Sequence, residues 1–187
     1  LRRKTAIQLT NEMKRYLASV GLANVRFHVD VKETDPNQYG SDDVNFFFSA
    51  NPGQPLSLLS DIASGGEMSR FLLAFKVILA QLDGPSTFIF DEIDTGVSGK
   101  VSSGITSLLQ RLSLNHQVFC ITHQPLVAAG ADHHFLVSKH VENELTFTKV
   151  SCLRNKEQRQ KELAQLAGGE FADANLYAAS LLDQQAA

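Results

Sequence analysis

Cysteine is scarce in this chain: Cys120 and Cys152 are the two among its 187 residues. Two cysteines this far apart exclude the disulfide framework of a small secreted domain. Cys120 lies inside the apolar run 118–121, so we expect a buried and reduced thiol there. A cytoplasmic protein fits this cysteine usage best.

Long apolar stretches and a strong excess of either charge are also missing. No run approaches the length of a membrane span, and no charged-then-apolar signal segment opens the chain, so we expect no membrane partner. A net charge of −3 gives no general attraction toward nucleic acid. A basic cluster near the N-terminus is either a local DNA-contacting patch or a solvated helix face: Arg2, Arg3, Lys4, Lys14 and Arg15.

A further absence concerns nucleotide chemistry. The sequence contains no Gly-rich loop ending in Gly-Lys-Ser or Gly-Lys-Thr, the segment whose amides and lysine hold nucleotide phosphates. We therefore expect the chain to show no appreciable ATP binding or turnover by itself. Because the first residue is Leu1 rather than Met, we also expect a fragment of a longer protein.

The first fifty residues predict a helix followed by an antiparallel strand pair. Residues 1–20 are helical in character, and Gly21 closes this helix as a left-handed cap. Alternating apolar residues predict a half-buried strand over 25–31, and a second strand follows at 44–50. Turn-forming residues over 35–42 predict a long hairpin tip between the two strands.

The middle of the chain alternates helices with short apolar strands. Apolar residues at helical spacing predict an amphipathic helix from Met68 to Leu82. Strands at 88–90 and 118–122, separated by a helix over 101–112, are of the continuously apolar type that is buried on both faces of a parallel sheet. The fold class is therefore predicted as α/β, with a mostly parallel sheet flanked by helices. The remaining expected elements are a short helix from Pro125, strands at 135–137 and 145–150, a helix up to Leu166 and a helix at 173–182.

The segment Ala63-Ser64-Gly65-Gly66-Glu67-Met68-Ser69-Arg70 opens the amphipathic helix. Ser64 and Glu67 fit a capping box, in which each side chain accepts a hydrogen bond from the other residue's backbone N–H; such a cap is worth about 1 kcal/mol. The cap does not explain Gly65 and Gly66, since a glycine costs roughly 1 kcal/mol relative to alanine inside a helix. A polyphosphate does explain them, because two missing side chains let an anion reach the free N–H groups at the helix start.

Two acids, Asp91 and Glu92, close the first apolar strand. Ligands of open α/β sheets bind at this carboxyl end of the strands. One acid can hold Mg²⁺, directly or through water, while its neighbour polarises an attacking water. The alternative is a pair of solvated acids at a strand end; the adjacent Asp94 and Gly96, and the glycine-rich helix start before the strand, favour the nucleotide site.

Histidines stand at two further positions of interest. His123 follows the second apolar strand, where an imidazole can donate a hydrogen bond to a terminal phosphate. His133 and His134 suggest a metal site, but no cysteine or acid stands at ligand spacing. We therefore predict that His133 and His134 are solvated residues at a strand edge.

In this order, Ser64-Gly65-Gly66-Glu67, Asp91-Glu92 and His123 resemble the signature, Walker B and switch histidine of ABC-type ATPase heads. The resemblance is closest to the SMC-like branch that acts in bacterial DNA repair, and it extends over about residues 1–183. Three longer strings carry it: 63–70, 90–99 and 131–139.

Such heads are built from both ends of a chain that folds back through an antiparallel coiled coil. The resemblance thus implies that residues 1–20 are the end of the returning coil and that 21–187 form the C-terminal half of a head. ATP and Mg²⁺ are the implied cofactors. The implied roles are trans contacts to a second head's nucleotide for Ser64, Gly65, Gly66 and Glu67, Mg²⁺ binding through water for Asp91, activation of water for Glu92, a place in the loop crossing the head dimer for Asp94, and sensing of the γ-phosphate for His123.

The implied function is recombinational repair of DNA double-strand breaks, driven by ATP-dependent pairing of heads. The implied partners are the N-terminal half of the same head, a second head in a homodimer, and DNA. Two alternatives stay open. The chain could be a non-catalytic module that docks to a phosphate-loop partner, or it could belong to another SMC-like protein that organises chromosomes.

Overall fold

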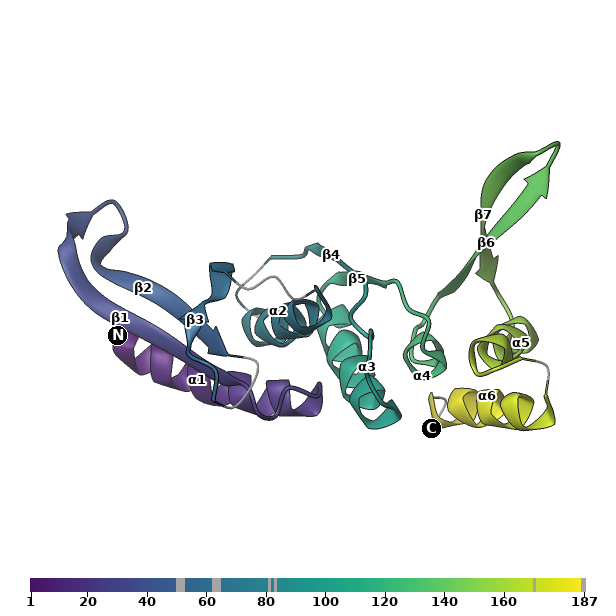
Figure 1. The fold of residues 1–187 in the computed structure, drawn as a ribbon, viewed down its shortest axis with the longest axis horizontal. Coiled ribbons are helices and arrows are strands. Elements are labelled where there is room, and N and C mark those ends of the chain that lie inside the picture. The colour runs from purple at the N-terminus through teal and green to yellow at the C-terminus, as the bar shows by residue number, and fades with distance from the viewer. Residues whose placement is uncertain (50–52, 62–64, 81, 83, 170, 186–187) are drawn as a thin grey trace. The chain divides into compact units, whose positions relative to one another are not determined.

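The computed structural model describes residues 1–49, 53–61, 65–80, 82, 84–169 and 171–185. The chain forms two compact units, Leu1–Ile121 and Thr122–Ala187, each described by itself below (Figure 1). The expected division into a coil end and a half-head stays a prediction. Within the described part of the chain, no helix has the length and apolar character needed to cross a lipid bilayer.

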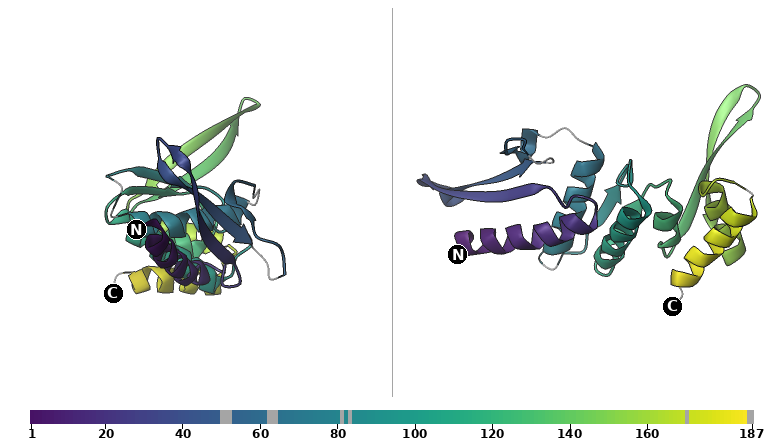
Figure 2. Two further views of the ribbon diagram at one scale, coloured as in Figure 1. Left: turned by 90° about the vertical axis from the view of Figure 1, so that its left-hand side faces the viewer. Right: turned by 60° about the horizontal axis from the view of Figure 1, so that its bottom comes forward.

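The first unit begins with helix α1 (Arg2–Ser19), which lies along strand β1 (Arg26–Asn37) in Figures 1 and 2. The helix ends where Gly21 adopts a left-handed φ of 79°. The N–H of Leu22 then donates to the carbonyl of Leu17 at 2.8 Å, the backbone bond of a glycine-terminated helix end. The predicted helix and its cap are both confirmed.

Strand β1 pairs antiparallel with β2 (Gly40–Ser49), and the pairing extends nearly to the hairpin tip. The predicted long tip over 35–42 is wrong, because Asn37 still pairs with Gly40 across a short turn. The register shifts between Glu33 and Asn37, so Pro36 sits where its missing N–H removes no ladder hydrogen bond. Strand β3 (Ser57–Leu58) adds to the other edge of β2.

A cluster of phenylalanines joins this hairpin to helix α2 (Gly65–Leu79). The ring of Phe71 on α2 lies 5.3 Å from that of Phe27 on β1 and 5.4 Å from that of Phe48 on β2, measured between centroids. All three side chains are buried, and tilted or edge-on contacts between such rings stabilise their packing. The hairpin therefore fixes α2 from one side.

Strands β4 (Thr87–Phe90) and β5 (Gln117–Cys120) form a parallel pair joined through helix α3 (Gly99–Ser113). The predicted α/β class is confirmed, and among the described strands this is the one parallel pair, the other pairings being antiparallel. Helices α2 and α3 run below the pair in Figure 1. The predicted burial on both faces is wrong within this chain: Ile89, Phe119 and Ile121 are 69%, 45% and 58% exposed.

The described residues of the second unit form a hairpin and three helices. Strands β6 (His134–Glu142) and β7 (Leu145–Leu153) pair antiparallel over more residues than predicted, and the hairpin extends away from the helices in Figure 2. Helices α4 (Pro125–Ala129), α5 (Lys156–Leu166) and α6 (Ala172–Gln185) appear where the sequence indicates. Their shared core is small and consists mainly of alanine and leucine: Ala128, Ala129, Leu163, Ala164, Ala174, Ala178, Leu181 and Leu182.

Replacement of Gly104 by alanine tests the packing of α1 against α3. A Cβ at Gly104 would collide with the carbonyl of Ser19 at the end of α1, whereas nothing lies within 4 Å of a Cβ at Gly99, the first residue of the same helix. We expect Gly104→Ala to lower the free energy of unfolding by about 1–3 kcal/mol, as overpacking does. Chemical denaturation measures it. Gly99→Ala is the matched control, and equal stability of the two variants would contradict this packing.

Candidate active-site surface

Helix α2 starts at the two glycines of the signature segment. Ala63 and Ser64 lie outside the described residues, so the structure does not test the expected cap. Gly66 is pressed against the loop after β4: a Cβ there would lie 3.2 Å from the carbonyl oxygen of Glu92 and 3.3 Å from the guanidinium of Arg70. The absence of a side chain at Gly66 therefore lets the Glu92 carbonyl approach α2 within the first unit, a contact that the sequence did not predict.

Glu92 follows β4 directly after Asp91, and both residues are exposed. Glu92 has a φ of 56°, in the left-handed region that costs a non-glycine residue about 1–3 kcal/mol. Its carboxylate oxygen Oε2 lies 3.6 Å from the position a Cβ on Gly65 would take. The first unit thus brings Gly65, Gly66, Asp91 and Glu92 together on one surface.

Side chains of α2 bond to the backbone of this loop on both sides of Glu92. The Ser69 hydroxyl lies 3.4 Å from the carbonyl oxygen of Asp91 and 3.0 Å from that of Gly65. The Arg70 guanidinium donates to the carbonyl of Ile93 at 3.3 Å. The first two turns of α2 therefore hold the segment that carries Glu92, the candidate catalytic carboxylate.

Arg70 is a functional candidate that the sequence reasoning missed. It is buried, and its burial lowers the pKa of the guanidinium, while the carboxylate of Glu67 on the preceding turn acts in the opposite direction. A usable signal was present: Arg70 stands four residues before Ala74 and seven before Val77, on the face of the helix that is buried.

Asp94 is fully buried, unlike Asp91 and Glu92. Its assignment to the nucleotide and the head-dimer loop stays a prediction. Burial raises the pKa of the Cys120 thiol to about 12, and the carboxylates of Asp94 and Asp91 add to the effect. The side chain of Cys120 is half-buried rather than buried as predicted, but its thiol is protonated at neutral pH.

His123 is exposed and belongs to the second unit, whereas the acids lie in the first. Its predicted contact with a phosphate therefore stays a prediction.

The predicted solvation of the histidine pair is right for His133 and wrong for His134. His133 is exposed, but His134 is buried at the start of β6, where burial and the nearby Arg159 guanidinium lower its pKa. Its Nδ1 has no hydrogen-bond partner among the described residues. No three metal-ligating side chains gather anywhere in the described part of the chain, so the interpretation of His133 and His134 as a metal site gains no support.

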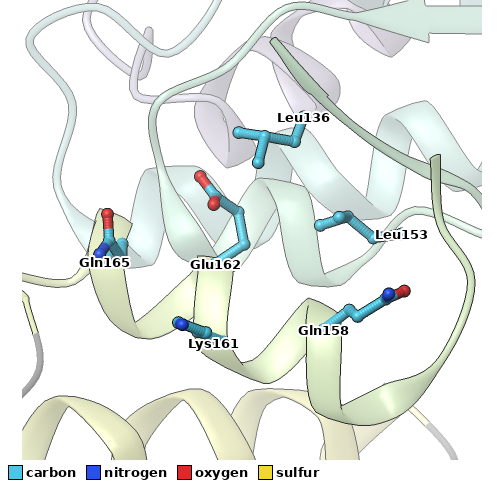
Figure 3. Close-up of a pocket in the computed structure, with 6 residues that line it drawn as sticks. All are labelled: Leu136, Leu153, Gln158, Lys161, Glu162 and Gln165. Carbon is cyan, nitrogen blue, oxygen red and sulfur yellow. The ribbon is translucent and has the colours of Figure 1, made fainter. Parts of the chain in front are cut away.

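Two cavities differ in their relation to the acids. A groove of about 210 Å³ lies between α2 and β4, and Ser69, Lys76 and Asp91 line it together with apolar residues. A second cavity, of about 310 Å³, lies in the second unit between α5 and the β6–β7 hairpin, where Glu162 points toward Leu136 (Figure 3). The larger cavity contains none of the predicted site residues, so the candidate site is the surface around Asp91 and Glu92.

The donor set at this surface fits Mg²⁺ held jointly with phosphates. Asp91 and Glu92 offer exposed carboxylate oxygens, the ligand type that Mg²⁺ prefers, and Mg²⁺ commonly takes one or two carboxylates plus substrate phosphates. An all-protein cage would need a larger group of ligands than the described residues bring together. The surface therefore suits a metal that arrives with a nucleotide.

Several curated proteins are similar in sequence to this chain over most of its length. The chain is 43% identical over 203 residues to the DNA repair protein RecN of Synechocystis sp., matching 100% of this chain and 35% of that protein. It is 37% identical to RecN of Halalkalibacterium halodurans and 36% identical to RecN of Bacillus subtilis, matching 98% and 92% of this chain. The chain thus spans about a third of the length of these curated relatives. No protein-family model matches the sequence.

Solved structures give the fold. The Smc head domain of Pyrococcus yayanosii, with a coiled coil and joint, matches 88% of this chain and 30% of that chain with a TM-score of 0.62 at 19% identity. A structure from a study of ATP-driven dimerization and DNA-stimulated activation of SMC ATPases matches 90% of this chain and 96% of that chain, with a TM-score of 0.52 at 17% identity. The chain therefore has the fold of part of an SMC head.

The buried His134 predicts a pH dependence of stability. Its pKa in the folded state lies below the unfolded value, so the unfolded chain binds more protons in acid and stability falls as the pH drops below about 6.5. Unfolding of the protein followed between pH 7.5 and 5 measures this. We expect His134→Phe to lose part of the dependence and His133→Phe, the exposed neighbour, to retain it. Identical pH profiles for the two variants would contradict the burial of a neutral His134.

Proposed function

The chain belongs to the RecN family of SMC-like ATPases, and from this premise we propose that it is the C-terminal part of an ATPase head acting in DNA repair. The finer proposal is recombinational repair of DNA double-strand breaks. In the complete protein, this part joins a phosphate-loop half, and the assembled heads pair and hydrolyse ATP.

One observation carries the proposal: the glycine start of α2 and the acidic end of β4 form a single surface. Gly65 approaches the Glu92 carboxylate, and Gly66 approaches its carbonyl. The free amides at a helix start bind an anion. Exposed carboxylates can bind a metal ion or accept a proton from water. Nucleotide hydrolysis needs both of these chemistries, and in a pair of heads the amides of this surface would serve one nucleotide while its acids serve the other.

The proposed roles follow from the atoms that each residue presents. The exposed carboxylate of Asp91 would hold Mg²⁺ through water, and the carboxylate of Glu92 would accept a proton from the attacking water. Bound Mg²⁺ supplies charge neutralisation at the phosphates. The amides of Gly65 and Gly66, with Ser64 and Glu67, would contact the nucleotide held by a second head. His123 would donate to the terminal phosphate, and Asp94 would shape the loop between the heads.

The open face of the β4–β5 pair supports docking of the missing half. A parallel sheet is normally covered on both faces, yet Ile89, Phe119 and Ile121 are exposed here. About two thirds of the length of the curated relatives lies outside this chain. We propose that the phosphate-loop half from that part covers this face and supplies the lysine that this chain lacks.

The wider assignment is a homodimer of heads that acts on DNA in the cytoplasm. Its support is a structural neighbour that comes from a study of ATP-driven dimerization and DNA-stimulated activation of SMC ATPases. A non-catalytic docking module would use the same open sheet face, so that face does not discriminate between the two functions. The acids do, since docking alone gives Glu92 no task.

Measurement of nucleotide binding by the chain alone shows whether it carries half of a nucleotide site or a complete one. Because neither a phosphate loop nor its lysine is present, we expect no micromolar binding of ATP with Mg²⁺ and no turnover. Isothermal titration calorimetry and phosphate release measure the two quantities. A micromolar dissociation constant for the isolated chain would refute the half-site.

Replacement of Glu92 by glutamine tests catalysis in the complete protein. Gln cannot accept the water proton, so we expect ATP turnover to fall by roughly 10²–10⁴-fold while ATP-dependent dimers persist. Steady-state phosphate release and light scattering measure the two properties. Glu144→Gln is the matched control, because Glu144 is also exposed and also has a positive φ, of 64°, but lies in the β6–β7 turn. Unchanged turnover in Glu92→Gln would remove Glu92 from the reaction.

A further inference from the structure

A buried arginine, Arg70, donates a hydrogen bond to the loop that carries the candidate catalytic carboxylate of Glu92. Arg70 is 7% exposed, which is unusual for a guanidinium, since this group is costly to remove from water without partners. One of its terminal nitrogens donates to the carbonyl of Ile93, and its Nε has no hydrogen-bond partner within the described residues. Such an arrangement stabilises the fold poorly and calls for a different explanation.

The backbone around Glu92 supplies that explanation. Glu92 holds a left-handed φ of 56°, a conformation that persists only where the surroundings impose it. Ser69 contacts the carbonyl before Glu92, and Arg70 bonds the carbonyl after it. Side chains of α2 therefore hold the backbone carbonyl of the residue on each side of Glu92.

The same guanidinium also touches the signature turn. A Cβ on Gly66 would lie 3.3 Å from the Arg70 Nη1 and 3.2 Å from the Glu92 carbonyl oxygen. Arg70 thus lies in contact with both the glycine start of α2 and the loop that carries Glu92. A displacement of either would be transmitted to the other, because close-packed groups leave no free volume.

We propose that Arg70 is a positioning residue: it fixes the Glu92–Asp94 loop on the first turns of α2 and so aims the Glu92 carboxylate. This proposal rests on the proposed ATPase function for its catalytic consequence, but the link between Arg70 and the loop is a property of the nucleotide-free fold. Arg70 touches no reacting atom. It acts through the carbonyl of Ile93.

Hydrogen–deuterium exchange of the complete, nucleotide-free protein tests the link itself. Arg70→Met keeps most of the side-chain volume and removes the guanidinium, so we expect faster exchange of the amides at 92–95 and unchanged exchange in α3. Arg111→Met is the matched control, because the Arg111 guanidinium lies over the Tyr16 ring of α1, 5.6 Å from its centroid. Equal exchange at 92–95 in the two variants would overturn the proposal.

Steady-state kinetics test the consequence for catalysis. Misplacing a catalytic group by about 1 Å can cost ~10²-fold in rate, so we expect Arg70→Met to lower kcat at least ~10-fold with KM within about 3-fold of the unaltered protein. Arg70→Lys keeps one donor and should recover part of kcat. A purely structural role would instead lower the folded fraction and leave kcat per folded molecule unchanged, which would refute the positioning role.

One further variant, together with Glu92→Gln, keeps the test decisive. If Arg70→Met fails to fold, Gly66→Ala disturbs the same contact from the other side, and it should also speed exchange at 92–95 without nucleotide; unchanged exchange there would contradict the link. Failure of the proposed function can be distinguished from failure of this link. The first would appear as normal ATP turnover in Glu92→Gln, whereas the exchange rates at 92–95 are measured without nucleotide and do not depend on hydrolysis.

Discussion

The contact between the first two turns of α2 and the loop after β4 is the constraint on which the candidate site depends. Gly66 lets the loop approach, Ser69 and Arg70 hold its carbonyls, and Glu92 between them adopts a left-handed φ of 56°. The phenylalanine cluster fixes α2 from the hairpin side. The hairpin thus packs against α2, and α2 in turn holds the loop that carries the candidate catalytic residue Glu92.

This arrangement gives the glycines two physical tasks. Toward solvent, their missing side chains leave amides open to an anion, as the sequence indicates. Toward the protein, Gly66 makes room for the Glu92 carbonyl and the Arg70 guanidinium. The signature turn and the candidate catalytic residue Glu92 are therefore linked by direct packing within one chain, although the family resemblance assigns them to two different nucleotides of a head pair. Such a link would let one site influence the other.

The sequence predicted the features that depend on local pattern. The helix over 1–20 with its Gly21 cap, the phenylalanine-rich hairpin and the β4–α3–β5 alternation follow from periodicity and turn residues, and the structure contains them. Features that depend on packing between distant segments were missed. The short hairpin tip depends on a register shift near Pro36, and the burial of Arg70 and His134 depends on neighbours far away in the sequence. The open face of the β4–β5 pair was missed because a strand pattern does not reveal what covers it.

The central proposal is that Glu92 activates water in a head completed by another segment. The distance between the Glu92 carboxylate and the attacking water, in a structure of the complete head with a non-hydrolysable ATP analogue and Mg²⁺, tests this most directly. We predict hydrogen-bond range, about 2.6–3.2 Å, with Arg70 still bonded to the carbonyl of Ile93. A carboxylate directed away from the terminal phosphate, with another residue holding the water, would contradict the account.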